Sequence, residues 1–413
     1  MTAGSRTAAP TAQTGAPRRG GTVWLGTGVI LLALNLRPAL VAVSPLAPTI
    51  KAASGMSSAE LSLLTSLPLL CFGLLAPLAP RAGRRWGLER TLLGSMAFVL
   101  GGTALRLVAA EWALFGGSVL VGAGIAVANV LLPALIKRDF AGRTGLMTGL
   151  YSMSLFGGAA LAAGVTVPVG TAAGLDWRTT LACWGFLAAV AIAVWAPRAR
   201  AAGPVPRTGA RAVRGLWSSP LAWAVTLYMG LQSLNYYAAA AWLPTVLESA
   251  GMDAGQAGWM LSLSSLLGIT GSFLAPVVSG RRLGAGAIAV LGAVLCGAGF
   301  AGLLAAPVGG AYLWMVLLGL GQGAAISLAL LFIVQRAPDA RIASQLSSNA
   351  QGFGYVLAAF GPAVLGASHD ATGSWTLPLV LLAAALLPQA LCGALASRDR
   401  LVAERPRIRP QGE

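Results

Sequence analysis

The residue with the clearest chemical potential in this sequence is Arg37, about 15 residues into a long apolar run. Arginine stays protonated under any plausible condition. Holding it at membrane depth costs at least about 2.5–3.5 kcal/mol unless water or a partner meets it. Every Asp and Glu lies in or beside a tail or a loop between the apolar runs. A water-filled cavity that admits an anion would resolve this imbalance, because a guanidinium matches a carboxylate or similar planar anion.

Two structural interpretations of Arg37 compete with anion binding. Its side chain could extend to the membrane interface and keep its charge in water. It could also donate to helix carbonyls that Pro38 leaves free, because proline removes a backbone donor from the helix. We favour the anion site, since only that interpretation supplies an opposite charge.

Other polar residues also lie deep in apolar runs. Gln232, Asn235 and Tyr236 are spaced i, i+3 and i+4, so they share one helix face. This face could bind a solute, or it could make interhelical hydrogen bonds worth about 0.6 kcal/mol each. The spacing leaves both interpretations open. The candidate solute-binding residues are Arg37, Asn35, Asn129, Gln232, Asn235, Tyr236 and Gln322.

The elements that must position these side chains are apolar helices. The chain is 56% hydrophobic and only 10% charged, whereas a soluble domain is typically about 25% charged. About 20 apolar helical residues cross a hydrocarbon core of about 30 Å. We therefore predict an all-α membrane protein with twelve transmembrane helices. They fall at 22–44, 60–80, 91–109, 112–136, 144–170, 178–196, 220–244, 256–279, 285–305, 311–335, 342–367 and 375–396.

The distribution of positive charge supports this count. The net charge of +16 could suggest a nucleic-acid partner, but the cations lie in short clusters between apolar runs. With both termini in the cytoplasm, the tails and inner loops hold 24 of the 28 Lys and Arg residues, and the outer loops hold three. Cytoplasmic loops carry such an excess. We predict a multi-pass protein of the cytoplasmic membrane, in contact with the lipid bilayer and without nucleic acid.

The longest polar connection divides the chain into two halves. An offset of 197 residues places Gly83-Arg84-Arg85 over Gly280-Arg281-Arg282, and Asn35 over Gln232. Two parallel six-helix repeats are a known transporter plan. The predicted division is a disordered tail 1–21, a six-helix bundle 22–196, a linker 197–219, a second bundle 220–396 and a tail 397–413.

The sequence lacks the motifs of an enzyme. The only lysines are Lys51 and Lys137 and neither follows a glycine, so a Walker A motif is excluded. Four cysteines stand singly in apolar runs, without zinc-ligand spacing. There is no nucleophile–base pair and no glycine-rich cofactor turn. We expect no catalytic residue, no metal and no cofactor.

Several segments resemble the major facilitator superfamily, and within it the cyanate permease type that includes bacterial nitroimidazole transporters. They lie in the predicted spans 1, 4, 5, 7 and 11. The segments are Asn35–Pro38 with Pro45–Pro48, Ala128–Pro133, Lys137–Phe140, Gly145–Tyr151, Gly230–Leu234 with Trp242–Pro244, and Gln351–Tyr355 with Gly361–Pro362.

One motif departs from the family pattern. The superfamily's cytoplasmic signature after span 2 reads G-x-x-x-D-R-x-G-R-R, and here Ala76 and Pro80 replace its glycine and aspartate. The missing acid puts the usual charge-relay gate between spans 2 and 11 in doubt. The basic part remains as Arg81, Gly83, Arg84 and Arg85, which we assign to the cytoplasmic gating motif.

The resemblance implies a monomeric carrier of the bacterial cytoplasmic membrane that works by alternating access, with spans 1, 4, 7 and 10 lining its cavity. Its expected partner is a small, anionic solute such as cyanate or a carboxylate, bound by Arg37. Efflux of nitroimidazole-like compounds is the alternative, and a non-transporting receptor is a third, disfavoured because the polar segments are short. No carboxylate lies within a span, so uniport, anion exchange and symport of a protonated substrate all stay open.

Overall fold

The computed structural model describes residues 19–43, 46–56, 58–203, 216–279 and 283–402, and every element in these ranges is a helix. Residues 1–18, 204–215 and 403–413, which belong to the predicted tails and linker, lie outside the described residues, as does the repeat segment 280–282.

The first half of the chain contains several broken helices. Pro38 begins a new short helix after α1, so the first predicted span is two helices joined by residues 35–37. The second and sixth predicted spans are also divided. The helices are α1 (Arg19–Leu34), α2 (Pro38–Val41), α3 (Ala47–Ser54), α4 (Ser58–Leu75), η2 (Ala76–Leu78), α5 (Ala79–Trp86), α6 (Leu88–Leu105), α7 (Glu111–Asp139), η3 (Ala141–Arg143), α8 (Thr144–Ala172), α9 (Trp177–Ala182) and α10 (Gly185–Ala201).

The second half has one unbroken helix for each predicted span. Internal prolines such as Pro244 and Pro362 lie within these helices without ending them, because neighbouring helices in a membrane can satisfy the freed backbone groups. After η4 (Leu216–Ser218) come α11 (Pro220–Ser249), α12 (Ala254–Ser279), α13 (Ala285–Ala305), α14 (Ala311–Arg336), α15 (Ala340–Thr372) and α16 (Thr376–Ala396).

Within the described residues, nine helical segments are long and apolar enough to cross a membrane. The three other predicted spans correspond to α4 with α5, to α6 and to α11. Helix α11 carries the polar run Gln232–Tyr237 in its middle. Polar residues at this depth are expensive and are retained for function or helix packing.

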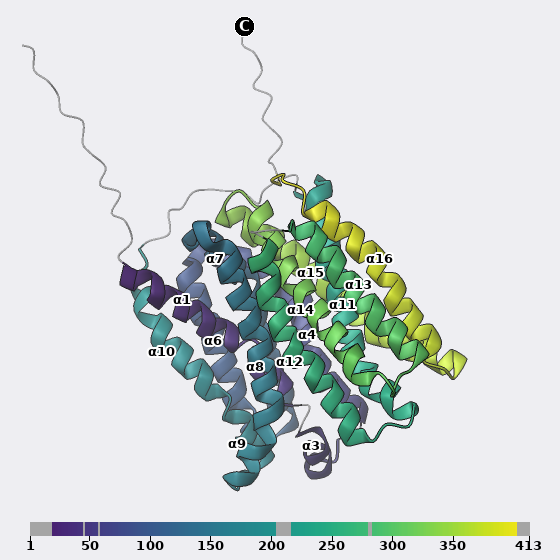
Figure 1. Ribbon diagram of the computed structural model, residues 1–413. Coiled ribbons are helices and arrows are strands. Elements are labelled where there is room, and N and C mark those ends of the chain that lie inside the picture. The colour runs from purple at the N-terminus through teal and green to yellow at the C-terminus, as the bar shows by residue number, and fades with distance from the viewer. Residues whose placement is uncertain (1–18, 44–45, 57, 204–215, 280–282, 403–413) are drawn as a thin grey trace, which may run out of the picture.

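The helices of the two halves lie side by side in one bundle (Figure 1). Contacts between the halves run along α8 and α12, and between α15 and both α4 and α7. Helices α5, α7, α10 and α14 all finish with arginine in their last turn, and we call this end of the bundle the basic end.

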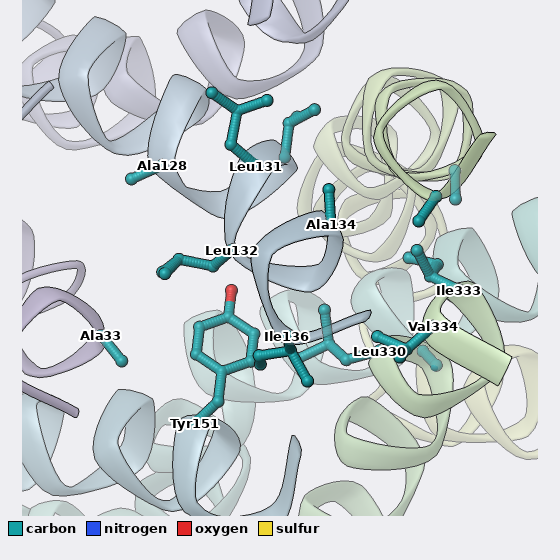
Figure 2. Close-up of a cluster of buried hydrophobic side chains, with 14 of the residues drawn as sticks. Ala33, Ala128, Leu131, Leu132, Ala134, Ile136, Tyr151, Leu330, Ile333 and Val334 are labelled. Carbon is teal, nitrogen blue, oxygen red and sulfur yellow. The ribbon is translucent and has the colours of Figure 1, made fainter. Parts of the chain in front are cut away.

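Apolar side chains fill the space between α7 and α14 near the basic end. The last turns of α7 and α14 meet there, and their inward side chains are at most 2% exposed. Figure 2 shows this cluster, with the Tyr151 ring of α8 beside it. The packed layer separates the middle of the bundle from the basic end. It contains Leu131, Leu132, Leu135, Ile136, Leu330, Leu331, Ile333 and Val334.

Candidate functional site

The break between α1 and α2 presents Arg37 to the interior of the bundle. Proline disfavours the helical conformation in the residue before it, and Arg37 has φ −125° and ψ −39° as the residue that precedes α2. The chain turns tightly here, since the backbone N–H groups of Asn35 and Leu36 donate to carbonyls only three residues back. Gly158 of α8 packs against this turn, and a methyl group there would overlap the Leu34 carbonyl oxygen.

The Arg37 guanidinium has a phenol as its partner. Its Nη1 donates to the Tyr237 hydroxyl over 2.7 Å, and its central carbon lies 5.8 Å from the centre of the Tyr237 ring. The side chain is half-buried. In the described part of the chain, no carboxylate forms an ion pair with it. The Arg37 side chain donates to a phenol and not to a helix carbonyl, and its other N–H groups are left available.

Five aromatic rings form a row that passes Arg37 and joins the two halves. Ring centres are separated by 5.2 Å for Phe72 and Tyr355, 6.2 Å for Tyr355 and Tyr237, 5.2 Å for Tyr237 and Tyr236, and 5.9 Å for Tyr236 and Phe156. The rings meet at steep angles, the edge-to-face arrangement that aromatic quadrupoles prefer. Such a row can hold a flat solute and still leave the cation exposed to its acidic group.

A small cavity opens beside this row. Its free volume is about 20 Å³, roughly the space of one water molecule, and residues of helices α8, α11, α12 and α14 line it. Phe156 and Tyr236 form one wall, and Ser264 and Gln322 contribute polar groups. The Gln322 Nε2 atom is buried and has no hydrogen-bond partner among the residues that the structure describes. Since an unpaired buried amide is costly, this donor is suited to a bound acceptor. The structure thus brings the predicted residues Tyr236 and Gln322 to one cavity.

The predicted residues Asn35 and Asn129 are engaged with protein groups. The Asn35 amide nitrogen donates to the Leu31 carbonyl over 2.8 Å and to the Leu187 carbonyl of α10 over 3.1 Å. The Asn129 side-chain oxygen accepts a 3.3 Å hydrogen bond from the Tyr151 hydroxyl. Both side chains are buried, and these contacts fix helices that surround Arg37.

Gln232 and Asn235 do not line the cavity that Tyr236 lines. The Gln232 amide nitrogen donates to Ser233 Oγ over 2.7 Å within its own helix. The Asn235 amide nitrogen donates to Gln389 Oε1 of α16 over 3.1 Å. Asn235 therefore points toward α16, while Tyr236, the next residue along α11, points toward the cavity. The face predicted from the i, i+3, i+4 spacing is thus divided between helix packing and the cavity.

Arg106 is a second arginine whose side chain lies deep in the protein. The count of cations by segment assigned it to an outer loop. Arg106 does lie in the connection between α6 and α7, but its side chain is 1% exposed and lies among helices. Its Nη1 donates to the Ala39 carbonyl of α2 over 2.7 Å, and its Nη2 donates to Ser118 Oγ over 2.9 Å. The side chain folds inward because the short helix α2 offers carbonyls without helical partners. Arg106 thereby holds the segment that carries Arg37.

The predicted gating motif makes no ion pair in the described residues. Arg81 Nη1 donates to the Pro77 carbonyl over 2.9 Å. Gly83 packs against α7, since a methyl group there would lie 3.2 Å from a Leu131 methyl. The missing acid after span 2 therefore leaves Arg81, Arg84 and Arg85 without a carboxylate partner in this part of the structure.

The basic end has its charge network elsewhere, among α6, α7 and α10. Arg138 pairs with Glu89 and with Asp139, and Arg198 Nη2 lies 2.7 Å from an Asp139 oxygen. Burial alone would raise the pKa of Glu89, but the hydrogen bond from Arg138 and the charges of Arg138 and Arg198 lower that pKa below its ordinary value. These ion pairs join helices of the first half to one another, and in the described residues none of them reaches the second half.

The described residues contain no group of three His, Cys, Asp or Glu side chains that could hold a metal ion.

The residues predicted for the site do not include four of the rings in the aromatic row, namely Tyr237, Tyr355, Phe72 and Phe156. Tyr237 was within reach of the sequence, because it follows Tyr236 in a polar run. The other three required the packing of helices distant in sequence.

Relatives of known name match nearly the whole chain. The uncharacterized transporter YycB of Bacillus subtilis (strain 168) is 43% identical over 92% of this chain and 94% of its own. The 2-nitroimidazole transporter of Escherichia coli (strain K12) is 39% identical over 90% and 95%. The cyanate transport protein CynX of the same strain is 33% identical over 84% and 90%.

The fold matches a solved transporter structure. The proton:xylose symporter XylE, bound to 6-bromo-6-deoxy-D-glucose, superposes with a TM-score of 0.73 at 13% identity, over 91% of this chain and 94% of that one. This likeness confirms the predicted fold class of twelve transmembrane helices in two six-helix repeats. The family model of the Major Facilitator Superfamily matches residues 23–362. The chain is therefore a member of the major facilitator superfamily, a family of membrane transporters, as its sequence motifs indicated.

Proposed function

We propose that this protein carries a small organic or inorganic anion across the membrane, and that Arg37 binds the anionic group. The observation that carries the proposal is a half-buried guanidinium with a phenol partner and no carboxylate in the described structure. A cation inside a bilayer needs a counter-charge. A planar anion can supply it and use the free N–H groups of Arg37 in a two-point contact.

The proposed route is alternating access between the two halves, divided as 22–196 and 220–396. The apolar layer between α7 and α14 supports this, because it must separate before a solute at Arg37 can leave through the basic end. By the excess of cations we assign the basic end and both termini to the cytoplasm. The proposed location is the cytoplasmic membrane of a bacterium, and the proposed state is a monomer without a cofactor or catalytic activity.

The second candidate is efflux of flat, weakly charged compounds like the 2-nitroimidazole named for one relative. The row of rings from Phe72 to Phe156 and the unpaired Gln322 amide favour it, since aromatic faces and one donor suit a ring that carries acceptor atoms. Asn35, Asn129, Gln232 and Asn235 would then support the shape of the site through the contacts that they make. The two candidates differ in their need for the charge of Arg37.

Transport into proteoliposomes separates the candidates. Purified wild type, Arg37→Ala and Arg37→Lys are assayed for uptake of cyanate, benzoate and 2-nitroimidazole. Loss of a charge-assisted hydrogen bond of about 2–3 kcal/mol predicts uptake of a charged substrate about 30- to 140-fold lower in Arg37→Ala. Arg37→Lys should recover part of it, because lysine keeps the charge without the planar fork.

The matched control is Arg200→Ala, which removes an equal charge from an exposed position in the last turn of α10, at the basic end. Its uptake should stay within about twofold of wild type, because long-range effects of exposed charges are screened. Anion uptake that is equal in wild type and Arg37→Ala would refute the anion-carrier proposal. If 2-nitroimidazole uptake alone survives in Arg37→Ala, the second candidate is favoured. The absence of flux for all three solutes, with folded protein, would favour a receptor.

A further inference from the structure

A large cavity lies near the basic end, apart from the site around Arg37. It is open on one side and has a free volume of about 390 Å³ between the two halves of the protein. Arg81 and Arg84 line it from α5, and Asn349 and Phe353 line it from α15. Trp217 of η4 borders it as well. None of the described residues that line this cavity is acidic.

The two arginines have donors to spare. Arg81 makes a single hydrogen bond, to the Pro77 carbonyl, and Arg84 makes none among the described residues. Neither forms an ion pair in that part of the chain. The arginines of the neighbouring network are different, since Arg138 and Arg198 are paired with carboxylates. A cavity with two cations and no acid has the charge that binds a phosphate group.

Two large apolar side chains that line the cavity from α15 also face outward. Phe353 is 50% exposed and Val356 is 43% exposed. In a membrane-spanning bundle these side chains must contact hydrocarbon. The cavity therefore has lipid on its flank, and a ligand that enters there can carry an apolar tail.

An aromatic cluster marks the depth of the cavity. The ring centres of Trp217 and Phe353 are 5.0 Å apart, and Trp223 lies 5.6 Å from Trp217 and 5.7 Å from Phe353. Tryptophan is enriched where the hydrocarbon core meets the polar headgroups. The two arginines at this level are thus at headgroup height, and the apolar side chains of α15 continue toward the hydrocarbon.

We propose that this cavity binds one anionic glycerophospholipid, with its phosphate on Arg81 and Arg84 and an acyl chain along Phe353 and Val356. Basic pockets between transmembrane helices on the cytoplasmic side are suited to such headgroups. The bound lipid would contact α5 of the first half and α15 of the second half. It would therefore favour the conformation in which the cavity exists, because a ligand shifts an equilibrium toward the state that binds it better.

Native mass spectrometry of the full-length protein in detergent tests this site. The probes are phosphatidylglycerol and phosphatidylcholine with the same acyl chains. For wild type we expect one phosphatidylglycerol to bind at least about tenfold more tightly than phosphatidylcholine. The double variant Arg81→Ala/Arg84→Ala should lose this preference.

The matched control is Arg85→Ala/Arg143→Ala, which also removes two charges from the basic end, at exposed positions outside the cavity. It should keep phosphatidylglycerol binding within about twofold of wild type. Phe353→Ala keeps both arginines and should weaken phosphatidylglycerol binding severalfold through lost acyl contact, which gives a second readout if the double variant folds poorly. Thermal unfolding reports folding for each variant.

Three outcomes would overturn the proposal. Equal losses in the two double variants would mean diffuse attraction to the basic end. Displacement of phosphatidylglycerol by inorganic phosphate at equal concentration would mean a site for a free anion. Equal binding of phosphatidylcholine and phosphatidylglycerol in wild type would mean that the arginines do not select the headgroup.

Discussion

Arg37 and Arg106 are two arginines at the same short helix with opposite surroundings. Arg106 is sealed, and its donors go to a helix carbonyl and a serine hydroxyl. Arg37 is half-buried, and its one hydrogen bond goes to a phenol that could exchange it for a solute. The Arg106 Nε atom also has no hydrogen-bond partner among the described residues, so the two arginines differ in access: Arg106 is closed off from any solute, and Arg37 is not. The comparison assigns Arg106 to positioning and Arg37 to binding.

The sharpest way to break this comparison is to replace each arginine with methionine. Arg106→Met should lower the free energy of unfolding by about 1–3 kcal/mol, because the Ala39 carbonyl and the Ser118 hydroxyl lose their donor. Arg37→Met should lower it less, by about 0.5–1.5 kcal/mol, because only the hydrogen bond to the Tyr237 hydroxyl is lost. Thermal unfolding in detergent measures both. The assignment is wrong if Arg37→Met is the less stable of the two.

A smaller effect sharpens the role of the phenol beside Arg37. Tyr237→Phe removes only the hydroxyl that accepts from Arg37, so the guanidinium is held less firmly. Loss of a hydrogen bond of about 0.5–1.5 kcal/mol predicts an apparent KM for the transported anion raised about 2- to 12-fold. Initial uptake rates across a range of solute concentrations measure it.

The control is Tyr228→Phe, in which the removed hydroxyl is buried and makes no hydrogen bond to any described residue. Its uptake should equal that of wild type, and its stability should not fall, because an unpaired buried polar group is removed. A Tyr237→Phe variant that behaves like Tyr228→Phe would show that the phenol does not hold Arg37.

Much of the fold could be predicted from the sequence, because apolar length and the placement of cations are local properties. The breaks in the first half could be predicted less well. Pro38 ends α1, whereas Pro244 and Pro362 lie inside intact helices. Whether a proline ends a helix in a membrane depends on which neighbouring helices satisfy the freed carbonyls, and those neighbours are distant in the sequence.

The sequence could single out a candidate site residue only where the residue type itself was unusual for its position. Arg37 stood out because its charge is anomalous wherever the side chain points. The face of Gln232, Asn235 and Tyr236 did not, because an amide donates to a solute or to a neighbouring helix with equal ease. Only the packing shows that Asn235 reaches Gln389 on α16 and that Tyr236 reaches the cavity. The role of each of these residues in binding stays a prediction.

The comparison extends to Arg138 and Arg198 at the basic end, which do have carboxylate partners. Because the pKa of Glu89 is lowered in the folded state, its contribution to stability is present above its unfolded pKa, about 4.3, and is lost as the pH falls through the folded value. Glu89→Gln should therefore lower the free energy of unfolding by about 1 kcal/mol at pH 7.

This difference between wild type and Glu89→Gln should shrink as the pH falls below about 4.3. Glu248→Gln, at an exposed residue without an ion pair in the described structure, should show no such difference. Thermal unfolding from pH 7 to pH 3.5 measures both curves. A difference that persists at the lowest pH would mean that Glu89 acts through packing, and the contrast between carboxylate-paired arginines and the unpaired Arg37 would then lose its energetic basis.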